Sequence, residues 1–160
     1  MRLLVFVLAI VACHPGGRYV SSGRNAGDVD RGETNGRMFD FVSNKPDGDD
    51  WQIRVRGNSM WASYAREDSI DKLGAKTIGD KEEAKLWKLV DAVGIAERKK
   101  GKKDEDNGYV TLRLREPGEE EQHDIYTVYV SRETEDEDVL ALAGYLQDLV
   151  KKYFGEKPSF

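Results

Sequence analysis

The stretch Trp51-Gln52-Ile53-Arg54-Val55-Arg56-Gly57-Asn58 sets the architecture expected of this chain of 160 residues. Apolar and polar side chains alternate strictly from 51 to 56, and a period of two is typical of a strand that buries one face. The Gly-Asn pair that follows tolerates the positive backbone angles of a tight reversal. We therefore predict a strand at 51–56 that turns back at once into another strand.

The segments on either side of this strand extend the prediction to a three-stranded meander. Residues 38–42 form a short apolar run, and Lys45-Pro46-Asp47-Gly48 has the composition of a turn. Residues 59–66 can return beside the strand at 51–56 as a third strand, whose register the pattern leaves open.

A helix is predicted to begin at Asp80 and to end at Gly94. Asp80 can cap the first turn with Glu83 as its reciprocal partner. Gly94 fits a left-handed cap, which places Ile95 against Val90. The apolar side chains that recur at helical spacing along one stripe are Leu86, Leu89, Val90 and Val93, with Trp87 at its edge.

A second hairpin and a second helix follow a charged loop. The loop at 98–108 carries a basic block and then an acidic one, a composition that disfavours burial. Residues 109–115 and 125–130 alternate again, and Pro117-Gly118 with the acidic run to Asp124 connects them. Thr134-Glu135-Asp136-Glu137 is typical of a capping box, and Gly155 with Pro158 ends the helix. Its apolar stripe consists of Val139, Leu142, Leu146, Leu149, Val150 and Tyr153 or Phe154.

The predicted order is therefore β-β-β-α-β-β-α in a single α+β domain at 37–160. Hairpin connections imply an antiparallel sheet, here of about five strands, and two one-sided helices imply that both pack on one face of it. This order, with an apolar helix ending near Gly94 and a closing hairpin plus amphipathic helix, is similar to emfourin-type proteins. These are small bacterial inhibitors of thermolysin-like metalloproteases. The resemblance covers about 38–154 and implies protease inhibition, without assigning an inhibitory residue.

The N-terminus has the layout of an export signal. Arg2 precedes an apolar run at 3–11 that is too short to span a bilayer, which takes about 20 residues. Ile10-Val11-Ala12-Cys13 resembles the lipobox of bacterial lipoproteins, which implies that residues 1–12 are cleaved and that Cys13 is acylated. Two or three acyl chains make such an attachment effectively permanent. An ordinary secretory signal is the alternative.

The resemblance to lipoproteins also implies a location in the cell envelope. An Asp after the lipidated Cys favours the inner membrane in Gram-negative bacteria, and His14 at that position favours the outer membrane. Residues 13–36 then form a Gly-rich tether with a reach of roughly 25 Å.

Cysteine usage and charge narrow the classes of partner. Cys13 is the only cysteine, so the folded part contains no disulfide. Loss of residues 1–12 removes Arg2 alone among charged residues and takes the net charge from −5 to −6. An acidic chain argues against nucleic acid or anionic lipid as a general partner.

Residue types that carry out catalysis are scattered along the chain. His14 and His123 are too far apart in the predicted structure to share a site, and acylation consumes the only thiol. No serine lies in a G-x-S-x-G turn, and Gly101-Lys102 lacks the earlier glycine of a phosphate-binding loop. We predict no catalytic residue, no cofactor and no enzymatic activity.

Metal binding is not predicted either. Zinc would require several closely spaced histidines or cysteines. Two acidic stretches supply oxygen ligands but lack the full calcium-binding loop with its distal Glu, and we interpret both as solvated surface. These stretches are Asp47, Asp49 and Asp50, and Asp104, Asp106 and Asn107.

One surface is a candidate for protein binding. If the apolar residues of the strands at 51–56 and 109–115 face the helices, alternation places arginines and tyrosines on the opposite face. The alternative is ordinary cross-strand pairing with Glu116, Glu133 or Asp124. The tryptophans Trp51, Trp61 and Trp87 are predicted as core. The candidate interaction residues are Arg54, Arg56, Tyr109, Arg113, Arg115 and Tyr129.

The function that follows is that of a lipid-anchored envelope protein that acts by protein–protein interaction. It is held to the membrane through Cys13 and binds an envelope protein, with no role in binding nucleic acid. Inhibition of an exported metalloprotease and binding of a small ligand are the alternative functions.

Overall fold

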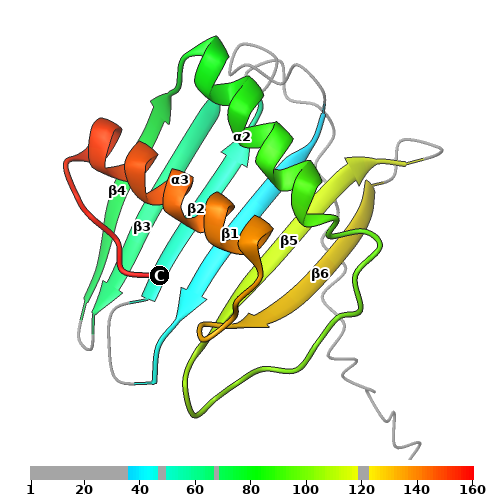
Figure 1. Cartoon of the computed structure of the whole chain (residues 1–160). Helices are drawn as coiled ribbons and strands as arrows, with labels where there is room; N and C mark the ends of the chain where they lie inside the picture. The colour runs from blue at the N-terminus through cyan, green and yellow to red at the C-terminus, as the bar shows by residue number, and fades with distance from the viewer. Residues whose placement is uncertain (1–35, 47–49, 67–68, 119–122) are drawn as a thin grey trace, which may run out of the picture.

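The computed structural model describes residues 36–46, 50–66, 69–118 and 123–160. These residues form one antiparallel sheet with the strand order β4-β3-β2-β1-β5-β6 and two helices (Figure 1). The strands are β1 (Met38–Asn44), β2 (Asp50–Arg56), β3 (Ser59–Arg66), β4 (Ser69–Thr77), β5 (Tyr109–Pro117) and β6 (His123–Ser131). The helices are α2 (Asp80–Val93) and α3 (Glu137–Phe154).

Both helices cover the same face of the sheet, as Figure 1 shows. This arrangement confirms the predicted α+β class, the antiparallel sheet and the pair of helices on one side. Each predicted strand and helix is present, and the sequence order of the elements holds apart from one additional strand.

The additional strand is β4, so the sheet has six strands and not about five. The sequence prediction missed it because its side chains do not alternate in burial. Most are exposed, including Ile70 at 67%, and Leu73 is the apolar residue that packs against the core. Gly74, with a φ of +88°, lies beside a break in the pairing register at Ala62 and Ser63, which further disturbs any period of two.

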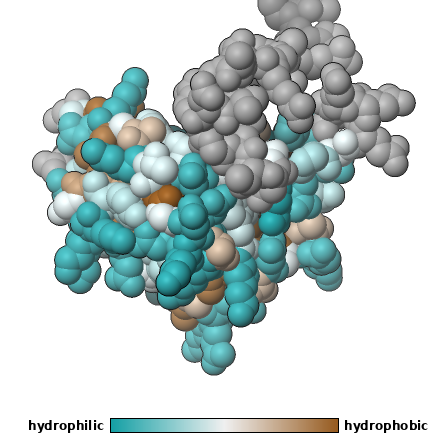
Figure 2. Space-filling model, turned by 90° about the horizontal axis from the view of Figure 1, so that it is seen from above, coloured by the Kyte–Doolittle hydropathy of each residue, from teal (hydrophilic) through white to brown (hydrophobic). Residues whose placement is uncertain are grey.

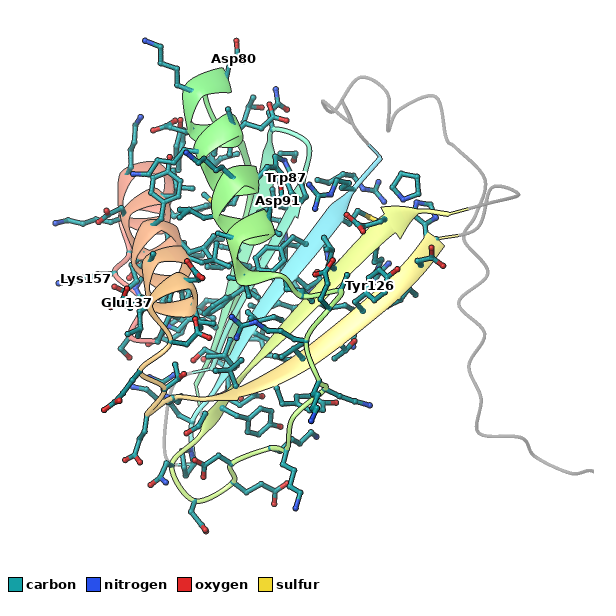
Figure 3. All side chains as sticks on the ribbon, turned by 45° about the vertical axis from the view of Figure 1, so that its right-hand side comes forward. Asp80, Trp87, Asp91, Tyr126, Glu137 and Lys157 are labelled. Atoms are coloured by element: carbon teal, nitrogen blue, oxygen red, sulfur yellow. The ribbon has the colours of Figure 1, made fainter. Side chains whose placement is uncertain are left out.

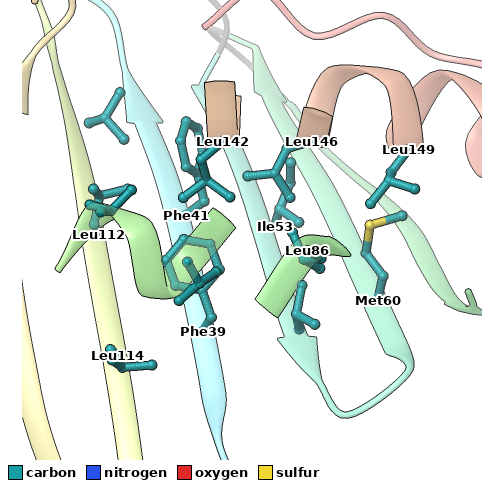
Figure 4. Packing of buried hydrophobic residues seen from close by; sticks show 14 of the residues in the cluster. Phe39, Phe41, Ile53, Met60, Leu86, Leu112, Leu114, Leu142, Leu146 and Leu149 are labelled. Carbon is teal, nitrogen blue, oxygen red and sulfur yellow. The ribbon is translucent and has the colours of Figure 1, made fainter. Parts of the chain in front are cut away.

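The core lies between the sheet and the helices (Figure 4). Its centre includes Phe39 and Phe41 of β1, which are fully buried, and Figure 4 shows Phe41 beside Leu142 and Ile53 beside Leu86. The predicted apolar stripes are buried except for Leu89 of α2 and the last members of the α3 stripe, Tyr153 and Phe154, which are half-buried. The fully buried helix residues are Leu86, Trp87, Val90, Val93, Val139, Leu142, Leu146, Leu149 and Val150.

The N-terminal caps of both helices differ from the prediction. The cap of α2 is Gly79, whose N–H donates to the Glu82 carboxylate at 3.1 Å, so Asp80 and Glu83 do not form the box. The cap of α3 is Asp136, which accepts hydrogen bonds from the backbone at 138 and 139. Thr134 instead accepts from the N–H of Asp136. Acidic residues lie in the first turn of α2 and on both sides of the start of α3, and pattern alone does not decide which residue takes the cap.

The C-terminal caps agree with the prediction, and polar contacts join the two helices at both ends. Gly94 and Gly155 both adopt the left-handed conformation, with φ of 63° and 79°. At one end Lys152 donates to Glu82 at 2.5 Å, and at the other Arg98 donates to Asp136 at 2.6 Å. These two contacts fix the antiparallel helix pair over the sheet.

Candidate functional site

The face of the sheet opposite the helices, called the open face from here on, carries the residues predicted as an interaction surface. Side chains alternate along each strand, so those beside core residues point away from the helices. Burial follows this alternation in β2 and β5, where Arg54 and Arg113 are exposed between buried neighbours. All six predicted residues lie on the open face: Arg54, Arg56, Tyr109, Arg113, Arg115 and Tyr129.

Four arginines surround one carboxylate at the centre of the sheet. β1 lies between β2 and β5, and its Asp40 is paired with Arg54 on one side and Arg113 on the other. Met38 lies between the other two arginines in the same way. This group carries an excess of positive charge in a chain of net charge −5. The arginine cluster is defined as Arg54, Arg56, Arg113 and Arg115 around Asp40.

Asp40 is the buried member of the arginine cluster, with a side chain 6% exposed. The Arg54 Nε donates to its Oδ1 at 2.6 Å, and the Arg115 Nη2 lies 3.6 Å from its Oδ2. Arg56 contacts the Met38 sulfur at 3.0 Å from its Nη2. A carboxylate removed from water needs such partners, because burial without them is costly.

Arg113 is the member of the cluster best placed to bind a partner. Its side chain is exposed, and within residues 36–46, 50–66, 69–118 and 123–160 it has no ion-pair partner. Arg54 keeps 48% of its side chain exposed even while it holds Asp40. Guanidinium groups pair with carboxylates through two parallel hydrogen bonds, so this surface is suited to acidic groups.

The acids predicted to neutralise the arginines do not face them. Glu116 and Asp124 are paired with each other across β5 and β6, and alternation puts both on the helix side. Glu116 there contacts Arg37 at 3.0 Å, and Glu133 lies in the turn after β6. The residue that sequence reasoning missed is Asp40. The signal was its place between Phe39 and Phe41, since a strand that buries both phenylalanines turns Asp40 to the other face.

Arg37 forms a separate polar cluster on the helix side. It contacts Asp91 of α2 at 2.6 Å, and its guanidinium lies 4.9 Å from the Trp87 ring centroid. Figure 3 shows Trp87 and Asp91 together on α2, towards the sheet. With its contact to β5, Arg37 joins the start of β1 to a helix and to a second strand, which is a structural role.

The two tyrosines lie on the open face but are covered by the loop that follows α2. Tyr109 and Tyr129 make an edge-to-face pair with ring centroids 5.9 Å apart. The Lys103 Nζ lies 5.4 Å and 5.6 Å from the two rings, and Lys100 is 5.5 Å from Tyr129. The structure therefore separates them from the arginine cluster and makes them the site where this loop is held.

The same loop covers the outer edge of β6. The backbone N–H of Tyr129 donates to the Lys100 carbonyl at 2.7 Å. Ser131 donates to Asp104 at 2.6 Å, and this hydrogen bond lowers the pKa of the Asp104 carboxyl. Asp104 of this loop thus makes a local structural contact. Covering an edge strand in this way hinders pairing with other chains.

The three tryptophans divide between the core and the open face. Trp51 and Trp87 are buried, at 3% and 7% exposure, as predicted. Trp61 is not a core residue, because it is half-buried on the open face and paired with Arg54. An indole beside an arginine is a common composition for the centre of a protein interface.

No metal centre is apparent in the described part of the chain. Its His, Cys, Asp and Glu residues form no group of three or more that could hold a metal ion. Of the residues considered for calcium, Asp47 and Asp49 lie outside the described residues, as do the acids at 119–121. His123 is exposed at the start of β6. Figure 2 shows the molecule from above as mostly hydrophilic, with scattered apolar residues.

The N-terminal predictions lie outside the described residues. These are the signal at 1–12, the lipidation of Cys13, the neighbouring His14 and the tether before residue 36. Neither helix in the described ranges has both the length and the apolar character required to cross a membrane.

Comparison with known proteins adds no relative. No family model matches the chain, and no curated protein matches it. The emfourin-type resemblance stays a prediction.

Proposed function

We propose that this chain is a lipid-anchored, non-catalytic protein of the bacterial cell envelope that binds an acidic protein through its open face. The arginine cluster is the observation that carries the proposal. Arg113 is exposed without an ion-pair partner among the described residues, and Arg54 remains half exposed. The lipobox that ends at Cys13 supports the anchor and the location, with the outer membrane favoured by His14.

The distribution of charge supports binding by the cluster and not by the chain as a whole. A chain of net charge −5 repels acidic partners on average. A local excess of arginine therefore orients an acidic partner towards the open face and also contributes to the affinity for it. Arginine, tyrosine and tryptophan are the residues that most often contribute large binding energies at interfaces.

Two of the arginines, Arg54 and Arg115, are also held in place before a partner binds. Both contact the buried Asp40 carboxylate, and side chains that are already held by such contacts lose less entropy on binding. Metalloprotease inhibition and small-ligand binding are the alternative functions predicted from the sequence. The open face gives neither of them a specific residue.

Cross-linked recovery of partners from native envelopes tests this proposal. The Arg113→Glu variant reverses an exposed charge without unpairing the buried Asp40, which Arg54→Glu would do. We expect the variant to remain folded and lipidated but to lose the acidic partner. The matched control, Lys88→Glu on α2, makes the same charge change on the helix side and should keep it.

Two results would contradict the proposal. One is recovery of the same partner with Arg113→Glu as with the unaltered chain. The other is binding of the purified domain to phosphatidylglycerol vesicles with no protein partner, since the arginines would then serve a lipid headgroup. A Cys13→Ser chain controls for partners recovered only because the protein is at the membrane.

A further inference from the structure

The open face has a shallow hollow next to the arginine cluster. Its volume is about 200 Å³. The hollow lies at the β4 side of the face, and Ile70, 67% exposed, forms part of its rim. The lining side chains on the open face are Val42, Gln52, Ser63, Ala65 and Ile70, together with Asp50.

The hollow and the cluster are neighbours along the same strands. In β2, Gln52 of the hollow is two residues from Arg54, and in β1, Val42 is two residues from Asp40. Residues two apart in a strand lie on the same face about 7 Å from each other, and residues four apart lie about 13 Å apart. One partner segment can therefore contact both.

The two parts of this surface call for different chemistry. The arginines require carboxylates, whereas the hollow presents Val42, Ala65 and Ile70 with few charges. It is too open to enclose a small molecule, since pockets for such ligands bury most of the ligand surface. An apolar side chain that projects from a protein segment suits an open hollow with this largely apolar lining.

We propose that the partner presents an extended segment in which acidic side chains are followed, two to four residues later, by an apolar one. The carboxylates bind the arginine cluster, and the apolar side chain enters the hollow. This inference rests on the proposed function and deepens it by specifying the partner. This spacing follows from the geometry of extended chains. In a segment that runs along β2, every second side chain points to the same side, as in the strand itself.

Titration of the mature chain, as Cys13→Ser, with two synthetic peptides tests the inference by NMR. Both peptides carry aspartates at two alternate positions, and the next alternate position is leucine in one and serine in the other. We expect the leucine peptide to bind about tenfold more tightly, which corresponds to about 1.4 kcal/mol. The amide signals of Val42 and Ala65 should shift with the leucine peptide alone.

Two variants separate the two parts of the surface. Ala65→Gln fills the hollow without adding charge and should abolish the preference for leucine while the serine peptide binds as before. Thr127→Gln, on β6 of the same face, is its matched control and should keep the preference. Arg113→Glu should weaken both peptides together.

The outcomes distinguish this inference from the proposed function. Equal affinity for the two peptides would overturn the role of the hollow and leave the arginine cluster standing. No binding of either peptide would overturn both. Concentration-dependent dimerisation in sedimentation, with shifts at Val42 and Ala65, would assign the hollow to a second copy of the chain and also overturn the inference.

Discussion

Replacement of Asp40 by asparagine removes the charge that holds the arginine cluster while keeping the size of the side chain. Asp40 is 6% exposed and accepts from Arg54 at 2.6 Å, with Arg115 at 3.6 Å. Loss of one partner of a fully buried ion pair costs about 3–5 kcal/mol, and a hydrogen bond to a charged group contributes about 1.5–3 kcal/mol.

The expected loss of unfolding free energy lies closer to the range for a hydrogen bond to a charged group than to the range for a fully buried ion pair. Arg54 is 48% exposed and can be solvated after the change, and the Arg115 contact is longer than a hydrogen bond. We expect Asp40→Asn to lower the free energy of unfolding by about 2 kcal/mol. For a domain of this size, the Tm should then fall by about 6 °C.

Urea unfolding followed by tryptophan fluorescence measures this change, with thermal unfolding as a second readout. The control is Asp91→Asn, which breaks a pair with Arg37 whose carboxylate is 56% exposed, and it should cost less than about 1 kcal/mol. A loss below about 0.5 kcal/mol for Asp40→Asn would refute the view that the arginines compensate a buried charge.

Three further outcomes are expected. Hydrogen bonds from Lys152 and Tyr153 lower the pKa of Glu82 from 4.5 to about 2, so its stabilising contribution is complete above pH 4.5 and is lost as the pH falls towards 2. The difference in unfolding free energy between the unaltered chain and Glu82→Gln should therefore disappear over that interval, and a constant difference would contradict it. Gly101→Ala should speed hydrogen exchange at Tyr129, because a Cβ on that left-handed residue collides with the Tyr129 carbonyl. Its control, Gly144→Ala in α3, has open space and should be neutral or stabilising, and unchanged exchange in Gly101→Ala would argue against a docked loop. Cys13→Ser should move the protein from the membrane fraction to the soluble envelope fraction, and an unchanged distribution would exclude lipidation at that residue.

Much of the fold follows from periodicity in the sequence. The strand at 51–56 and the helix stripes were predictable because each buries one side against the core, and burial selects apolar residues at a fixed period. β4 was not, because an edge strand with Ile70 exposed and Leu73 half-buried is under no such constraint. The cap of α3 was placed at Thr134 and lies at Asp136, since a run of acidic residues offers several equivalent caps.

The candidate site was only partly predictable for a related reason. Alternation places a side chain on one face or the other, which is how the arginines were found. It does not say which strands are neighbours. Asp40 reaches Arg54 and Arg115 because β1 lies between β2 and β5, and that order depends on long-range pairing. The cover over Tyr129 depends on a loop contact that has no period at all.

Photocross-linking from the open face in intact cells asks whether this surface meets a protein in the envelope. A photoreactive residue at Thr127, which is paired with Arg113, should give a discrete cross-linked species that disappears when Arg113→Glu is added. The same group at the exposed Asp148 of α3 should give none. A species that survives Arg113→Glu, or one that forms from Asp148 and not from Thr127, would show that the arginine cluster is not the binding surface.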